Sequence, residues 1–117
     1  MEFESLREYN LNKKGSYEEF PFGPSVMVFK VMGKMFALIA WQEEPLNITL
    51  KCDPELALHL REVYEAVRPG YYMNKRHWNT ITLDSTLPDK ELFKMIDDSY
   101  DLVVKNLRKA DRQKLQK

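Results

Sequence analysis

The pattern of apolar and polar positions predicts three strands in the first half of the chain. Residues 26–31 and 34–41 are rich in branched and aromatic side chains, as strands are. Gly33 lies between them and can adopt the positive φ of a tight turn, so we expect a hairpin. Both segments are apolar on both faces, which suits central strands of a covered sheet. Residues 46–50 alternate between apolar and polar side chains, which predicts a strand with one solvent-exposed face.

Apolar residues at helical spacing predict three helices. The first spans residues 1–12, with Phe3 and Leu6 facing inward. The second starts at Asp53 and Pro54, an N-cap residue followed by a proline in the first turn, and it ends before Pro69. The third starts at residues 88–89. The expected buried stripes are Leu56, Leu60, Val63, Tyr64 and Val67 in the second helix, and Leu92, Ile96, Tyr100, Val103 and Leu107 in the third.

The remaining segments complete the expected fold. Residues 13–25 contain glycine and proline and predict a loop, which Glu18 and Glu19 keep solvated. Residues 78–83 alternate as a last strand, and residues 108–117 predict a frayed basic tail. The order helix, three strands, helix, strand and helix predicts an α+β two-layer sandwich in which helices flank an antiparallel sheet. We expect one domain over residues 1–117.

Composition narrows the class of protein. An apolar fraction of 44% is too high for a disordered chain. The 18 basic and 18 acidic residues cancel, so electrostatic recognition has to come from local patches. A single cysteine favours a reducing compartment, the first residues do not resemble a secretory signal, and the longest apolar run, residues 35–41, is too short to span a bilayer. We therefore expect a cytoplasmic protein with no membrane partner.

The segment VRPGYYMNKRHWNTITL, residues 67–83, is the strongest functional candidate. No Asp or Glu lies between Glu65 and Asp84, and cations alternate with aromatic rings, a composition that suits the phosphates and bases of a nucleic acid. The alternative interpretation is architectural, with Asn74 capping a turn, Trp78 packed beneath it and the cations solvated. The candidate contacts are Arg68, Tyr71, Tyr72, Asn74, Lys75, Arg76 and His77 in this segment, with Lys30 and Lys34 beside the hairpin turn.

Lys30 and Lys34 make the hairpin tip a second candidate, because a protruding hairpin can lie along a nucleic-acid backbone. Two lysines beside a turn are also common on any exposed hairpin, and this solvated interpretation is favoured. The binding hypothesis gains support only if the tip and the segment 68–77 share a face. Lys51 and the basic tail would then extend the same patch.

The chain offers little for catalysis. Cys52 precedes a helix terminus, which can lower a thiol pKa, but no His or second Cys adjoins it. We interpret it as a small buried thiol, and His59 as a partly buried structural residue. The cysteine and the two histidines are too scattered for a zinc site, and no nucleophile motif is present. We expect no catalytic residue, no metal and no cofactor.

Four segments resemble the MmcQ/YjbR family. They are PFGPSVMVFKVMGKMFAL, LKCDPELALHLRE, VRPGYYMNKRHWNTI and LPDKELFKMIDDSYDLVV, in order from about Pro21 to Leu107, and MNKRHWNT is the most specific piece. Many relatives have His where this chain has Tyr72, so a two-histidine chemistry with His77 is not available here.

The resemblance implies a CyaY-like fold, shared in outline with secretion chaperones, and an uncharacterised bacterial protein. It also implies DNA binding through a double wing of hairpins and loops. On this hypothesis Arg68, Lys75 and Arg76 dominate weak contacts to phosphate that are largely indifferent to base sequence. The alternative is a protein-interaction module with no nucleic-acid role. We favour a monomer in either case.

Overall fold

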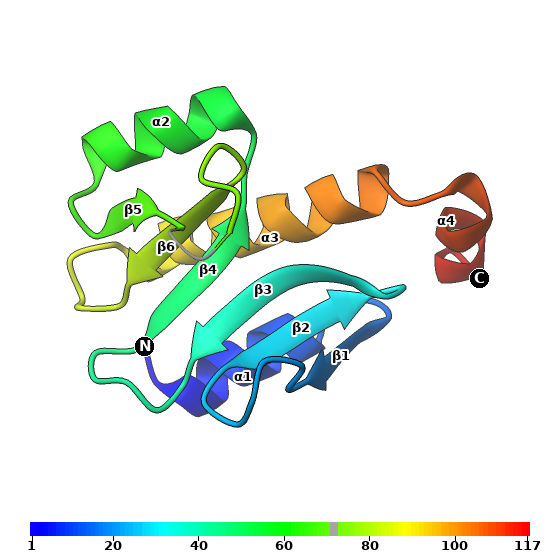
Figure 1. The fold of residues 1–117 in the computed structure, drawn as a ribbon, viewed down its shortest axis with the longest axis horizontal. Coiled ribbons are helices and arrows are strands. Elements are labelled where there is room, and N and C mark those ends of the chain that lie inside the picture. The colour runs from blue at the N-terminus through cyan, green and yellow to red at the C-terminus, as the bar shows by residue number, and fades with distance from the viewer. Residues whose placement is uncertain (71–72) are drawn as a thin grey trace.

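The computed structural model describes residues 1–70 and 73–117 (Figure 1). Its helices are α1 (Phe3–Leu11), α2 (Pro54–Val63), α3 (Asp89–Lys105) and α4 (Lys109–Leu115), and its strands are β1 (Ser16–Glu19), β2 (Met27–Val31), β3 (Lys34–Ala40), β4 (Asn47–Lys51), β5 (Val67–Pro69) and β6 (Trp78–Thr82). Within the described residues the strands form one sheet in the order β1-β2-β3-β4-β6-β5, and every neighbouring pair is antiparallel. The predicted α+β class with an antiparallel sheet is confirmed.

The turn between β2 and β3 forms the predicted hairpin. Met32 and Gly33 have φ angles of 49° and 82°, and two successive positive values are those of a type I′ turn. A bulge follows, because Phe29 pairs with Ala37 whereas Lys30 pairs with Met35. Phe36 is therefore the extra residue of β3, and it is fully buried on the same side as Ala37.

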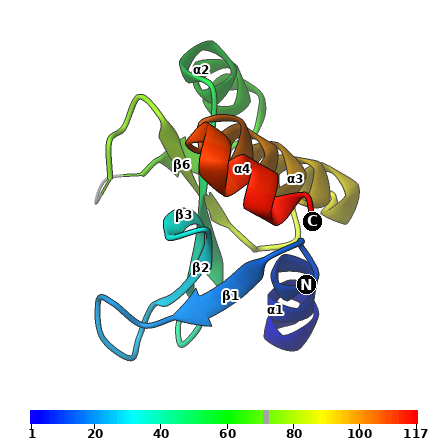
Figure 2. The same cartoon turned by 90° about the vertical axis from the view of Figure 1, so that its right-hand side faces the viewer.

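Helices α1 and α3 cover one face of the sheet, where the main core lies (Figure 2). The predicted stripe of the last long helix is buried: Leu92 to Val103 lie in α3 and confirm the spacing argument, and Leu107 is buried just beyond the end of the helix. Ser99 ties this helix to the sheet: its hydroxyl donates to the carbonyl of Phe36 at 2.6 Å and accepts from the backbone N–H of Lys51 at 2.9 Å.

On the opposite face no helix of residues 1–70 and 73–117 packs, which agrees with the predicted two-layer arrangement. In Figure 2 the loop between β1 and β2 and the loop between β5 and β6 project from this side. A small second hydrophobic cluster lies on this side and consists of Val28, Leu38 and Trp78. Loops rather than helices therefore bury the second apolar row of β2 and β3. We call this side the open face.

The prediction for α2 is correct in its start and wrong in its orientation. The helix begins at Pro54 as expected, but Leu56 and Val63 are exposed, and Ala57 is its buried residue. A small side chain lets the helix backbone approach the sheet, where Asn79 donates to the carbonyl of Ala57. Leu60 is half-buried, and Val67 belongs to β5 rather than to the helix.

Three further elements differ from expectation. The segment expected to be a solvated loop includes β1, in which Glu18 accepts a 2.8 Å hydrogen bond from the Arg7 side chain. The edge strand β5 ends at Pro69, a position where an edge tolerates proline. The tail expected to fray contains α4, whose Leu115 packs against the core. In the described part of the chain, no helix is long and apolar enough to span a membrane.

Candidate functional site

The loop from Gly70 to His77 joins the edge strand β5 to β6, and backbone hydrogen bonds hold both of its ends. The N–H of Gly70 donates to the carbonyl of Trp78 at 2.9 Å. A Cβ at Gly70 would lie 3.0 Å from Cβ of Trp78 and 3.1 Å from its carbonyl oxygen, so this close approach favours glycine. The N–H of Cys52 donates to the carbonyl of His77 at 2.7 Å, which ties the far end of the loop to the end of β4.

Asn74 caps a turn within this loop, as predicted. Its side-chain oxygen accepts from the N–H of Arg76 at 3.0 Å, and its carbonyl accepts from the N–H of His77 at 3.0 Å. Both interactions are local and fix the backbone that carries Lys75 and Arg76. The architectural interpretation of Asn74 is therefore correct, and it gives the neighbouring cations a defined position.

Arg61, which the sequence did not single out, supports the loop from α2. Its Nε donates to Oδ1 of Asn79 at 2.7 Å, and its Nη2 donates to the carbonyl of Lys75. Asn79 is only 2% exposed, and its amide also donates to Ala57 at 3.3 Å. The guanidinium therefore links the helix, the buried asparagine and the loop. A basic residue on a helix next to an apolar stripe gives no signal of this role by itself.

The three cations expected to dominate binding differ in their surroundings. Arg68, Lys75 and Arg76 are all exposed. Arg68 lies on β5 and donates to the hydroxyl of Thr82, whereas the other two lie on the loop. Tyr71 and Tyr72, the predicted stacking residues, lie outside the described residues.

The two hairpin lysines also differ from each other. Lys30 forms an ion pair with Glu19 at 3.1 Å, and its side chain is 20% exposed. Lys34 is exposed at the start of β3. Lys30 is therefore the weaker candidate for contact with an anion, because a neighbouring carboxylate already offsets its charge.

The loop and the hairpin share the open face. Trp78 is buried there against Val28 and Leu38, and Met35 of the hairpin and Met73 of the loop pack against the same cluster. The packing role expected for Trp78 is confirmed. The condition that the hairpin tip and the loop share a face is met for Lys30 and not for Lys34, because Lys34 pairs with Val31, whose side chain lies in the main core on the other face.

Strand register gathers further cations at one end of the sheet. Lys34 opens β3, Lys51 closes β4, and Lys51 pairs with Trp78 at the start of β6. Helix α4 reaches the same end, because Leu115 lies against Gly15 and Val31 is beside them. The basic residues of α4 therefore lie near the hairpin rather than on a free tail. We call the loop 70–77, Lys34, Lys51 and α4 together the basic end.

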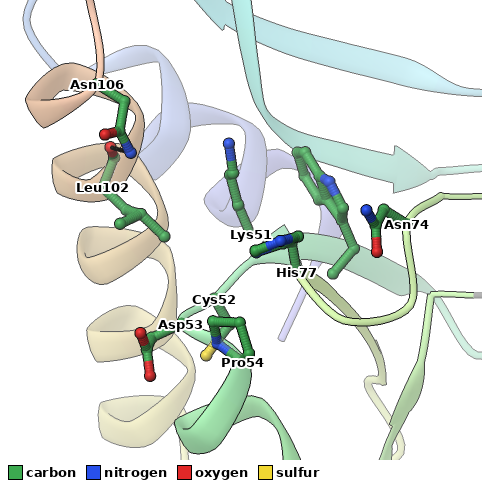
Figure 3. Close-up of a pocket in the computed structure, with 9 residues that line it drawn as sticks. Lys51, Cys52, Asp53, Pro54, Asn74, His77, Leu102 and Asn106 are labelled. Atoms are coloured by element: carbon green, nitrogen blue, oxygen red, sulfur yellow. Dashed lines mark hydrogen bonds between the residues drawn. The ribbon is translucent and has the colours of Figure 1, made fainter.

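A cavity of about 360 Å³ opens between the loop and the C-terminal part of α3 (Figure 3). Lys51, His77, Asn74 and Asn106 supply its polar groups, and Asp53 supplies an opposing charge. In Figure 3 the imidazole of His77 lies between Lys51 and Asn74. These groups can hold a small anion such as a phosphate by hydrogen bonds and charge.

Cys52 lines the same cavity but is not arranged as a nucleophile. Its sulfur lies away from the imidazole of His77 in Figure 3. Burial raises the pKa of the Cys52 thiol to about 11, and the charges of Asp53 and Asp98 add to this shift. The interpretation of Cys52 as a small buried thiol is confirmed. His59 is exposed on α2, so the expectation that it is partly buried is wrong.

A larger cavity of about 800 Å³ lies on the open face. Leu38, Ala40 and Val26 form its apolar part, and Thr49 and Thr80 form a polar part. Arg68, Gly70 and Met73 connect it to the loop, and Phe22 reaches it from the loop between β1 and β2. This cavity could not be predicted from the sequence, because its residues come from five separate segments.

Comparison with known proteins identifies relatives over nearly the whole chain. The YjbR family model matches residues 11–102. The uncharacterised protein YjbR of Escherichia coli (strain K12) is 34% identical over 115 residues, 98% of this chain and 97% of that protein. The uncharacterised protein YbdF of Escherichia coli O157:H7 is 38% identical over 96 residues, 82% of this chain and 79% of that protein. The crystal structure of DR2400 from Deinococcus radiodurans superposes with a TM-score of 0.92 at 39% identity, covering 98% of this chain and 88% of that one.

Proposed function

The chain belongs to the YjbR family, and we propose that it binds DNA weakly, with little preference for base sequence, through the loop 70–77 and the neighbouring hairpin. The relatives YjbR and YbdF are uncharacterised, so the proposal rests on this chain's own residues. The observation that carries it is the position of Lys75 and Arg76, exposed on a loop that Arg61 and Asn74 hold in place.

The surroundings of the loop support contact with a polyanion. Phosphates attract Lys and Arg side chains without regard to sequence, and each neutralised phosphate releases a counterion. Lys34, Lys51 and the cations of α4 extend the positive surface at the basic end. The cavity beside His77 adds the polar side chains of Lys51, Asn74 and Asn106. A phosphate backbone can therefore follow the loop and continue toward α4.

Duplex binding at several salt concentrations tests this proposal. We expect K75A/R76A to weaken binding of a fluorescent duplex and to lower the slope of log affinity against log salt by about two units, one for each cation. The matched control is K90A/K94A, which also removes two exposed lysines but from α3, on the helix-covered side of the sheet. Equal affinities and slopes for the two folded variants would exclude the loop as the contact.

The proposal is one of binding without catalysis. The Cys52 thiol is buried and has a raised pKa, so it is protonated at neutral pH and a poor nucleophile. In residues 1–70 and 73–117, no three His, Cys, Asp or Glu side chains group to hold a metal ion. A native mass spectrum with a stoichiometric metal or organic cofactor would contradict this part of the proposal. The cytoplasmic location that a single cysteine favours is compatible with access to DNA.

A second candidate is a protein-interaction module. Leu56 and Val63 lie seven residues apart, on the same side of α2, and both are exposed. Exposed apolar residues that share one helix face are typical of a protein contact. Salt separates the two functions, because an apolar interface depends on ionic strength much less than phosphate contacts do. A wild-type protein that binds no duplex at low salt would favour this candidate.

A further inference from the structure

The cavity on the open face combines apolar walls, paired hydroxyl groups and a cation, and the DNA-binding proposal does not use it. Its volume of about 800 Å³ falls in the range typical of small-molecule and nucleotide sites. Gly70 and Met73 line the cavity and belong to the loop 70–77, and Arg68 lines it from β5. A strand that follows the loop therefore passes the mouth of this cavity.

The apolar part of the cavity offers surfaces for a flat ring. Phe22 is 60% exposed, the largest exposure among the large hydrophobic side chains that remain uncovered on the described surface. Its ring reaches the cavity without being buried in the core, whereas Leu38 and Met73 belong to the packed second cluster. An exposed ring opposite aliphatic side chains can sandwich an aromatic ligand, as aromatic residues do with unstacked bases.

The polar part of the cavity matches the edge of a base. The hydroxyl oxygens of Thr49 and Thr80 lie 2.8 Å apart, so one donates to the other and the pair still offers a donor and acceptors. Asn47 donates to Oε2 of Glu43 at 2.7 Å, which leaves the carboxylate able to accept from a ligand N–H. Base edges carry both donors and acceptors, and these four side chains provide both.

Charged groups gather at one end of the cavity. Arg68 donates to Thr82, and Thr82 pairs across the sheet with Asn47, the residue that bonds Glu43. The guanidinium therefore lies at the same end of the cavity as the carboxylate, at the end of β6 away from the loop. An uncharged ring with donors and acceptors on its edge fits these two opposite charges, whereas a free carboxylate or phosphate placed there would face Glu43.

We propose that this cavity receives an unstacked base of single-stranded DNA, with the phosphates of the same strand held by the loop cations. The inference rests on the proposed DNA binding and adds that a single strand binds more tightly than a duplex. The reason is geometric: a duplex keeps its bases stacked and paired, so it can reach the loop with its phosphates but cannot place a base in the cavity.

The experiment compares a fluorescent 12-nucleotide oligothymidylate with a 12-base-pair duplex in anisotropy titrations at fixed salt. Wild-type protein should bind the single strand more tightly. Phe22→Ala should weaken single-strand binding by roughly fivefold or more, the effect of losing one base–aromatic stack, and leave duplex binding unchanged. The matched control is Phe20→Ala, which removes a 45% exposed ring from the same loop that does not line the cavity. Circular dichroism melting checks that both variants fold.

The outcomes separate this inference from the proposed function. If K75A/R76A weakens both ligands while Phe22→Ala and Phe20→Ala change neither, the loop binds DNA and the cavity inference is wrong. The inference is also overturned if the wild-type protein binds the single strand no more tightly than the duplex, even if K75A/R76A weakens the binding of both. If the wild-type protein binds neither ligand at low salt, the proposed function fails and the inference fails with it.

Discussion

Arg61 is the residue whose removal most directly tests how the loop 70–77 is held. In the folded protein its guanidinium donates to Asn79, Lys75 and, at 3.4 Å, the carbonyl of Trp78. Replacing it with Ala leaves Oδ1 of Asn79 buried without this donor. The carbonyl of Lys75 is at the surface, and the carbonyl of Trp78 keeps the N–H of Gly70 as a donor, so the buried amide accounts for most of the loss.

The expected magnitude follows from this single buried contact. A hydrogen bond to a charged donor contributes about 1.5–3 kcal/mol, so Arg61→Ala should lower the free energy of unfolding by about 2–3 kcal/mol. For a domain of this size that loss corresponds to a fall in Tm of roughly 8–15 °C. Arg61→Lys should lose most of the same energy, because an ammonium group cannot reach several acceptors in the fixed fork of a guanidinium.

Urea unfolding of the variants provides the measurement, with Arg108→Ala as the matched control. The Arg108 side chain is 83% exposed, and its loss should change stability by less than about 0.5 kcal/mol. A double-mutant cycle with Asn79→Ala should give a coupling energy of about 1 kcal/mol or more. An Arg61→Ala variant as stable as Arg108→Ala, or full stability in Arg61→Lys, would refute this account of the loop.

Two further predictions concern the core and the buried thiol. Ile96→Ala should cost about 2–5 kcal/mol, as other fully buried truncations do, whereas half-buried Leu60→Ala should cost less; equal costs in urea unfolding would contradict the orientation of α2. Burial raises the pKa of Cys52 from 9.0 to about 11, which favours the neutral thiol in the folded state. The contribution of the neutral thiol to the free energy of unfolding is therefore complete below pH about 9 and is lost as the pH rises toward about 11. The difference in free energy of unfolding between wild type and Cys52→Ala should fall across that window. A difference independent of pH would show that the thiol titrates alike in both states.

Elements whose sequence signal is local and regular formed as predicted. The stripe of α3, from Leu92 to Val103, is buried as its spacing predicted. Gly33 marks the hairpin turn, and Pro54 marks the start of α2. Each signal depends on residues within one or two turns of each other, so it could be read without knowing the neighbours in space.

Elements that depend on distant partners could not be predicted from the sequence. β5 has three residues, too few to show alternation, and its pairing with β6 defines it. Glu18 looked like a loop acid, but Arg7 of α1 pairs with it and β1 forms beside β2. The orientation of α2 depends on the approach of Ala57 to Asn79, which the pattern of large apolar residues does not reveal.

The sequence by itself determined the class of fold and the basic loop, because periodicity, turn residues and the run without acids are properties of neighbouring positions. The tertiary structure decided the site. Arg61 donates to Asn79, 18 positions away in the chain. The cavity is lined both by Phe22, from the loop after one edge strand, and by Arg68, from the other edge strand. The physical reason is that sheet register and helix packing bring these side chains together, and both are set by burial of the whole core rather than by any short stretch of residues.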